Sequence, residues 1–167
     1  MRINAIEYDH IGGYQVFLHN DEVRKKYLYS RIQESINGRF LIKTEDFPNS
    51  DLQAEYVTVN FFLPYPNPLV EGKIYLMGGL TQWQFLKENE LTYNFERRGF
   101  ESSILLKQGF YNYQYIFLPN NSQVGDVTLI EGSFYETNNE YTFYVYYRPK
   151  GTRYDQLVNI THIISHP

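Results

Sequence analysis

The stretch 72–119 constrains the fold more than any other part of the chain. It contains four short strand-like segments, separated by glycines and polar turns. In the last of them, 110–118, aromatic side chains occupy every second position: Tyr111, Tyr113, Tyr115 and Phe117. A period of two places these rings on one face of a strand and the intervening Asn112 and Gln114 on the other. We therefore expect a half-buried antiparallel strand whose tyrosines face a core.

Aromatic residues are abundant throughout the chain, which has 167 residues, of which 17 are Tyr and 12 are Phe. Flat rings pack well on a pleated surface, so this composition favours strands. It also argues against disorder, because disordered segments contain few aromatic residues. The length suffices for one domain with a sizeable core, or for one domain with an additional arm.

Short strand-like segments recur at intervals of roughly 8–12 residues, with turn signals between them. They cover 2–8, 14–18, 39–43, 55–63, 73–77, 91–95, 100–107, 110–118, 141–147 and 156–164. No helical pattern is long enough to cover a parallel sheet. This spacing predicts an all-β sandwich.

The polar loop DFPNSDLQ, at 46–53, is the best candidate for a domain boundary. It divides the chain into a β-rich N-terminal arm, 1–49, and a sandwich, 50–167. A sheet as short as the arm's is marginal by itself, so we expect the arm to pack on the sandwich and to bury Phe17 and Phe40. Within the arm, Asp21 is a candidate N-cap of a short helical segment.

Charge and composition exclude several functional classes. The chain has 15 Lys and Arg against 19 Asp and Glu, a net charge of -4, and it shows no basic stripe, so we expect no nucleic-acid partner. No segment approaches the roughly 18 consecutive apolar residues of a membrane span. The absence of Cys excludes disulfides and thiolate metal sites.

No residue pattern points to catalysis or to a bound cofactor. His162 and His166 stand four apart, a spacing that suits a metal on a helix, but the context ITHIISHP is β-branched and predicts a strand. The chain contains no nucleophile motif of the GxSxG type. We therefore expect a non-catalytic binding function, without metal or cofactor.

The single tryptophan, Trp83, lies in the loop LTQWQF, two residues before Phe85. A loop aromatic between amide side chains can stack on a sugar ring or anchor a protein partner. It can equally fill the core under the loop. The residues by themselves leave these alternatives open.

A second polar constellation occupies YYRPKGTRYDQL, residues 146–157. Pro149 and Gly151 shape a turn there. The polar side chains beside it are Arg148, Arg153, Tyr154 and Asp155. We expect a structural corner held by ion pairs and a tyrosine hydroxyl, rather than a partner site.

The segments IYLMGGLTQW and LTYNFERRGFESSILLKQGFYNYQYIFL resemble the glycogen-binding domain of the AMP-activated kinase β subunit and the matching module of starch-branching enzymes. The resemblance implies an immunoglobulin-like early-set sandwich in which Trp83 stacks on α-glucan. Gln114 stands where that family has a sugar-contacting Lys, and the family's second platform Trp has no counterpart in PNNSQVGD. The implied sugar site would comprise Trp83, Phe85, Gln82, Gln114 and either Asn138 or Asn139.

A closer resemblance covers nearly the whole chain. It rests on INGRFLI, AEYVTVNFFLPY, LTQWQF, LLKQGFYNYQYIF, GDVTLIEGSFYETNNEYTFYVYYRP and GTRYDQLV. These segments, in this order and spacing, look like the C-terminal part of the Bacteroidetes type IX secretion plug proteins. The resemblance implies a periplasmic fragment, without its signal peptide, that docks on an outer-membrane translocon barrel and closes it. Plug-like protein interaction is therefore the first functional hypothesis, and α-glucan binding through Trp83 is the second.

Overall fold

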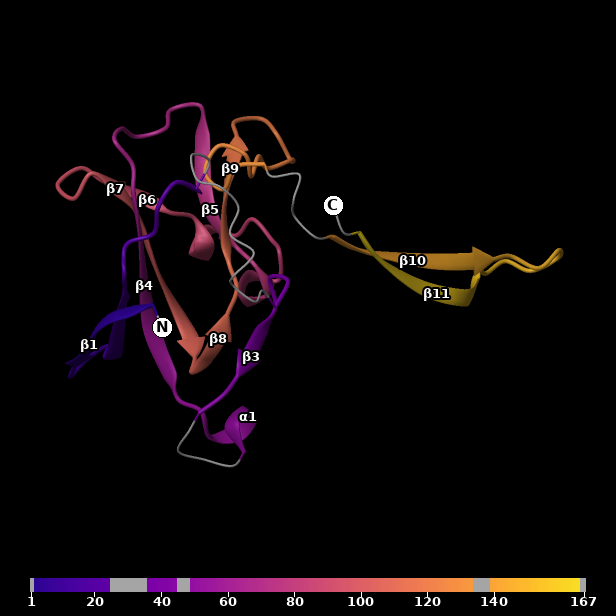
Figure 1. The fold of residues 1–167 in the computed structure, drawn as a ribbon, viewed down its shortest axis with the longest axis horizontal. Coiled ribbons are helices and arrows are strands. Elements are labelled where there is room, and N and C mark those ends of the chain that lie inside the picture. The colour runs from indigo at the N-terminus through magenta and orange to yellow at the C-terminus, as the bar shows by residue number, and fades with distance from the viewer. Residues whose placement is uncertain (1, 25–35, 45–48, 134–138, 166–167) are drawn as a thin grey trace. The chain divides into compact units, whose positions relative to one another are not determined.

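The structure is a computed structural model that describes residues 2–24, 36–44, 49–133 and 139–165. It confirms the expected all-β, immunoglobulin-like sandwich. The chain forms two compact units, Met1–Ser133 and Phe134–Pro167, and each is described by itself. Figure 1 shows the strands of both units.

The first layer of the sandwich is a five-stranded sheet of order β1-β2-β4-β7-β6. The parallel pairing of β2 with β4 brings the N-terminal arm into this sheet, and the other neighbours pair antiparallel. Its strands are β1 (Ile3–Asp9), β2 (Gly13–Leu18), β4 (Tyr56–Pro64), β6 (Thr92–Asn94) and β7 (Gly99–Lys107).

The second layer consists of two antiparallel strand pairs, β5 with β9 and β3 with β8. Short helical turns accompany them: α1 (Ser50–Gln53), η2 (Gly79–Thr81) and η3 (Lys87–Asn89). The strands of this layer are β3 (Phe40–Ile42), β5 (Gly72–Met77), β8 (Gly109–Tyr111) and β9 (Gln114–Pro119).

The core lies between these layers because each strand turns alternate side chains inward. On β4, Phe61 and Leu63 are buried in the main core cluster, while Asn60 lies on the opposite face of the strand. The cluster also contains residues of β5, β7 and β9: Ile74, Leu76, Phe100, Leu106 and Tyr115.

The tyrosine strand differs in part from the expectation. Tyr115 is fully buried, and the other three rings pack against the core half-buried, as the alternation predicts. The strand is interrupted, however, because β8 ends at Tyr111 and β9 begins at Gln114. The opposite face of the segment, which was expected to be exposed to water, is also covered. There, Ile116 is buried with Tyr75 and Met77 in a second apolar cluster.

The N-terminal arm packs on the sandwich, as expected. Val16 on β2 is buried and Phe17 is half-buried. The expected burial of Phe40 is wrong, because its side chain is 48% exposed and only stacks on Tyr111 at a centroid distance of 5.5 Å. The structure therefore places no boundary at 49–50. Because backbone pairing joins β2 to β4 and β3 to β8, the arm and the sandwich form a single unit that ends at Ser133.

The last two strands belong to the second unit, in contrast to the predicted domain 50–167. Instead, β10 (Asn139–Tyr147) and β11 (Gln156–Ser165) pair with each other as a two-stranded antiparallel sheet. We call this sheet the C-terminal ribbon.

Candidate interaction surface

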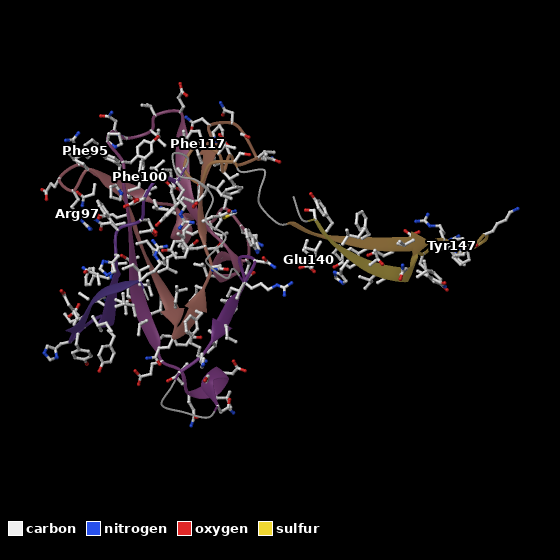
Figure 2. The ribbon with its side chains drawn as sticks, in the orientation of Figure 1. Phe95, Arg97, Phe100, Phe117, Glu140 and Tyr147 are labelled. Atoms are coloured by element: carbon white, nitrogen blue, oxygen red, sulfur yellow. The ribbon has the colours of Figure 1, made fainter. Side chains whose placement is uncertain are left out.

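Apolar and aromatic side chains occupy both faces of the C-terminal ribbon. Residues directly opposite each other on paired strands share a face. One face therefore carries Tyr141 opposite Ile163, and the other carries Tyr144 opposite Ile160. Figure 2 shows side chains projecting along both sides of β10, between the labelled Glu140 and Tyr147.

These side chains are exposed by between 46% and 60% of their maximum. They comprise Tyr141, Phe143, Tyr144, Val145, Tyr146, Tyr147, Leu157, Val158, Ile160, Ile163 and Ile164. A two-stranded sheet is marginally stable in water by itself. Exposed apolar side chains gathered on one small sheet are typical of an interaction surface.

The strand edges of the ribbon are a second means of association. Within the described residues, neither β10 nor β11 pairs with a further strand. Each outer edge therefore presents a row of backbone donors and acceptors, which another sheet can extend. The pairing is irregular between Val145 and Tyr146, where a bulge increases the local twist.

The tip of the ribbon contains the predicted corner. Arg148 binds Asp155 through two hydrogen bonds, at 2.7 Å from Nε and 2.8 Å from a terminal nitrogen. Thr152 closes the turn by donating from its backbone N–H and its hydroxyl to the carbonyl of Pro149. The contact of Tyr154 differs from the expected one, because it is the backbone carbonyl of Tyr154, rather than its hydroxyl, that accepts a hydrogen bond from Thr152, and Arg153 is exposed.

Trp83 lies on a different part of the fold from the ribbon. Its side chain is 50% exposed, and its ring lies so close to Gly38 that any side chain there would clash with it. Gly38 also has a φ of 71°, which favours glycine. Trp83 therefore covers the turn before β3 with one part of its ring and faces solvent with the other.

Within the first unit, Phe85 does not share the exposed surface of Trp83. Phe85 points inward and packs edge-on against Tyr75 at 5.1 Å, so it cannot serve as a stacking platform. Gln82 is exposed, and Gln114 is half-buried opposite Met77. Asn138 lies outside the described residues, and the backbone of Asn139 begins β10 in the other unit.

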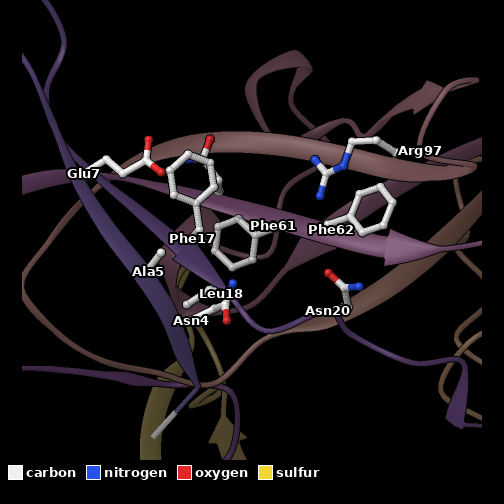
Figure 3. Close-up of a pocket in the computed structure, with 10 residues that line it drawn as sticks. Asn4, Ala5, Glu7, Phe17, Leu18, Asn20, Phe61, Phe62 and Arg97 are labelled. Atoms are coloured by element: carbon white, nitrogen blue, oxygen red, sulfur yellow. The ribbon is translucent and has the colours of Figure 1, made fainter.

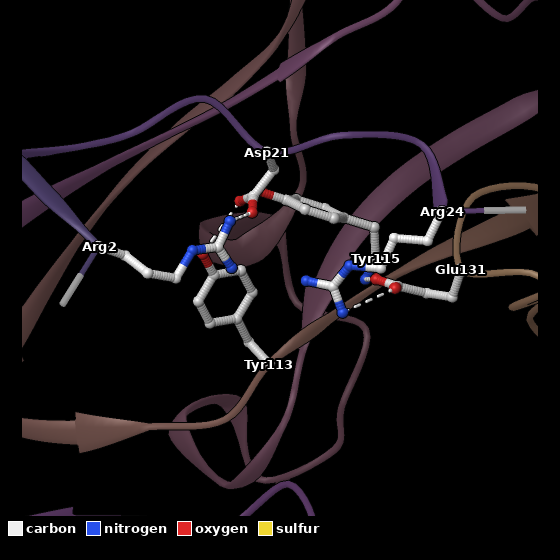
Figure 4. Close-up of polar contacts among 6 residues, drawn as sticks. All are labelled: Arg2, Asp21, Arg24, Tyr113, Tyr115 and Glu131. Carbon is white, nitrogen blue, oxygen red and sulfur yellow. Dashed lines mark hydrogen bonds and ion pairs between the residues drawn. The ribbon is translucent and has the colours of Figure 1, made fainter. Parts of the chain in front are cut away.

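Sequence reasoning did not find the buried polar cluster that joins the arm to the tyrosine strand (Figure 4). Its centre is Asp21, which is buried and binds Arg2. The hydroxyls of Tyr113 and Tyr115 donate to the same carboxylate at 3.0 and 2.6 Å. Burial, followed by the nearby Asp21 charge, raises the pKa of both tyrosines, so they remain protonated donors.

Glu131 occupies the second half of this cluster. It accepts a hydrogen bond from the backbone N–H of Tyr115 at 2.8 Å and pairs with Arg24 at 3.3 Å. Burial raises the pKa of Glu131 above its ordinary value of 4.5, while Arg24 opposes this shift. The cluster has a structural role, because its contacts join the arm to the tyrosine segment through Asp21 and to the segment before Ser133 through Arg24.

Glu131→Gln is expected to reduce the pH dependence of stability. Because the folded state holds the Glu131 proton more tightly than the unfolded state, wild-type stability falls as pH rises from about 4.5 through the raised pKa. Glutamine keeps an acceptor for Tyr115 and does not titrate. Urea unfolding at several pH values should show the wild type losing stability relative to the variant as pH rises. The opposite slope would contradict the raised pKa.

Comparison with solved structures finds a protein similar to this chain. A hypothetical protein from Parabacteroides merdae, a member of the Bacteroidetes, matches with a TM-score of 0.90 and 41% sequence identity. The match covers 99% of this chain and 41% of that protein, so the chain spans about two fifths of its relative's length. No protein-family profile and no curated protein matches the chain.

One further structural finding concerns membranes. Among the residues that the structure describes, no helix has the length and apolar character needed to cross a bilayer.

Proposed function

We propose that this chain is a non-catalytic protein-interaction module of a plug-like protein, which docks on an outer-membrane translocon barrel and closes its periplasmic opening. The observation that carries the proposal is the C-terminal ribbon, whose aromatic side chains face solvent on both sides. The proposal places the protein in the periplasm.

The segments that resemble the plug proteins coincide with the structural features that this role requires. NEYTFYVYYRP and GTRYDQLV form most of the ribbon and its tip, while AEYVTVNFFLPY contains β4 in the middle of the five-stranded sheet. The Parabacteroides relative supports the same assignment, because it comes from the phylum in which the plug proteins occur.

The ribbon suits docking on a protein surface. Tyrosine is enriched at interfaces because it buries a large ring and keeps a polar hydroxyl. Tyr144 and Tyr146 lie on one face, where their cross-strand partners are Ile160 and Leu157. Such a face can form the apolar centre of an interface from which water is excluded. The polar tip around Arg148 suits the solvated rim of the same interface.

Glucan binding through Trp83 ranks below this proposal. The half-exposed ring favours it, but Phe85 is packed into the second apolar cluster and Gln114 replaces the sugar-contacting lysine of the glycogen-binding domains. A single aromatic without a second platform makes a weak sugar site.

The proposal is tested by the affinity of the full chain for the purified translocon barrel in detergent, measured by biolayer interferometry. Tyr146→Ser is expected to weaken binding about tenfold or more, because truncation of interface tyrosines removes much of the binding energy. Tyr8→Ser on β1 is the matched control, since both side chains are 60% exposed. It should leave the affinity unchanged.

Two outcomes would contradict the proposal. In one, the wild-type chain shows no saturable binding to the barrel. In the other, Tyr146→Ser and Tyr8→Ser have equal effects, so that the ribbon makes no specific contribution. Circular dichroism of each variant establishes that the sandwich remains folded.

A further inference from the structure

The solvent-facing side of the five-stranded sheet is hollowed. Two adjoining depressions, of about 260 and 340 Å³, share Phe17, Asn60, Phe61 and Arg97 in their walls. Small-molecule sites usually measure roughly 300–1,000 Å³, so the first depression is slightly smaller than this range and the second lies at its lower end. We call them together the sheet-face hollow, and Figure 3 shows residues around the first of them.

The hollow is polar because the strands turn their hydrophilic positions away from the core. Across the sheet, Phe17 lies opposite Asn60, and Asn60 lies opposite Ser103. In the next row, Phe62 lies opposite Glu101, which in turn pairs with Thr92. Four neighbouring strands therefore present an aromatic, amide, hydroxyl and carboxylate surface on the same face.

The floor of the hollow is held in place by hydrogen bonds. The hydroxyl of Ser103 donates to Oδ1 of Asn60 at 2.6 Å. Nδ2 of Asn60 donates to Oε1 of Gln15 at 3.2 Å. These contacts fix the amide orientation across three strands before any ligand arrives, which lowers the entropic cost of binding.

One wall is the cation of Arg97, whose charge is matched by a neighbouring carboxylate. The guanidinium of Arg97 lies 3.8 Å above the centre of the Phe62 ring and donates to Glu101 at 2.9 Å. Asn94 donates to the other oxygen of Glu101, also at 2.9 Å. The planar guanidinium of Arg97 has further N–H donors beyond the one that binds Glu101.

The opposite wall combines a ring with an acceptor. Figure 3 shows the Phe17 ring facing the hollow, with the carboxylate of Glu7 beside it. Phe17 is half-buried and lines both depressions. Its ring offers an apolar surface for a ligand ring.

We propose that the sheet-face hollow binds a neutral oligosaccharide. Sugar rings offer apolar faces for Phe17 and hydroxyls that both donate and accept, which suits Glu7 and Arg97. Anionic ligands are disfavoured, because Glu101 already neutralises Arg97 and Glu7 adds a negative charge. The site is independent of the proposed docking function and shares no residue with the Trp83 loop.

The test is titration of the isotope-labelled full chain with cellopentaose and, separately, maltoheptaose, followed by amide NMR shifts. We expect saturable shifts on β2, β4 and β7 with one of the sugars and a Kd of roughly 1 mM. Phe17→Leu, which keeps apolar bulk but removes the ring, should weaken binding about tenfold. Glu7→Gln, at an exposed position that cannot affect the core, should weaken it as well.

Trp83→Ala distinguishes the two candidate sugar sites and should leave the Kd unchanged. The proposal is overturned if neither sugar gives saturable shifts. It is equally overturned if the shifts centre on the Trp83 loop, or if Phe17→Leu and Glu7→Gln bind as the wild type does.

Discussion

Asp21→Ala is expected to lower the free energy of unfolding by about 3–5 kcal/mol, because the buried hydroxyls of Tyr113 and Tyr115 lose their acceptor. Each buried donor without a partner costs about 1–3 kcal/mol, and the ion pair with Arg2 is lost as well. The cost should be evident in urea unfolding curves recorded by circular dichroism.

Two further substitutions make this prediction specific. Asp21→Asn keeps one carbonyl acceptor in the same shape, so its effect should lie between those of Asp21→Ala and the wild type. Asp51→Ala is the matched control, because Asp51 is an exposed aspartate on α1, and it should leave the unfolding midpoint unchanged. Equal stability of the two alanine variants would show that the cluster does not hold the arm.

Leu63→Ala is expected to cost about 2–5 kcal/mol, the range for removing a large apolar side chain from a close-packed core. Leu63 is 0% exposed and belongs to the main cluster between the layers. The cavity left behind loses contacts from both sheets, which is why the effect should approach the upper part of the range. Thermal and urea unfolding of the full chain measure it.

Leu105→Ala provides the control with the same chemical change. Leu105 lies on neighbouring β7 but faces the solvent side of the sheet and is 62% exposed. Its truncation should cost less than about 1 kcal/mol, because little apolar area returns to water. If Leu105→Ala destabilised the protein as much as Leu63→Ala, the assignment of the inner and outer faces would be reversed.

Strand positions could be predicted from the sequence because side-chain alternation and turn residues are local signals. The predicted strands 55–63 and 156–164 correspond closely to β4 (Tyr56–Pro64) and β11 (Gln156–Ser165). The predicted strand 110–118 failed in one respect, since it is broken before Gln114. There the backbone N–H of Asn112 donates to Arg39, a contact with the distant arm that no local pattern reveals.

The candidate sites were harder to predict from the sequence. Trp83 was identified from its loop position, but whether Phe85 faced solvent or core depended on the packing of Tyr75 and Gly125 around it. The Arg148–Asp155 pair was found because its members flank one turn. The sheet-face hollow was missed, because it needs residues from β2, β4 and β7 in register, and register is a non-local property.

By itself, the sequence determined the all-β class, most strand positions and the inward face of the tyrosine segment, because side-chain alternation follows directly from backbone geometry. Only the tertiary structure decided which strands pair. It placed β2 beside β4, buried Asp21 beneath two tyrosines 92 and 94 positions away, and paired β10 with β11 rather than with the sandwich. Those outcomes depend on contacts between distant segments, where burial and hydrogen-bond satisfaction outweigh local preference.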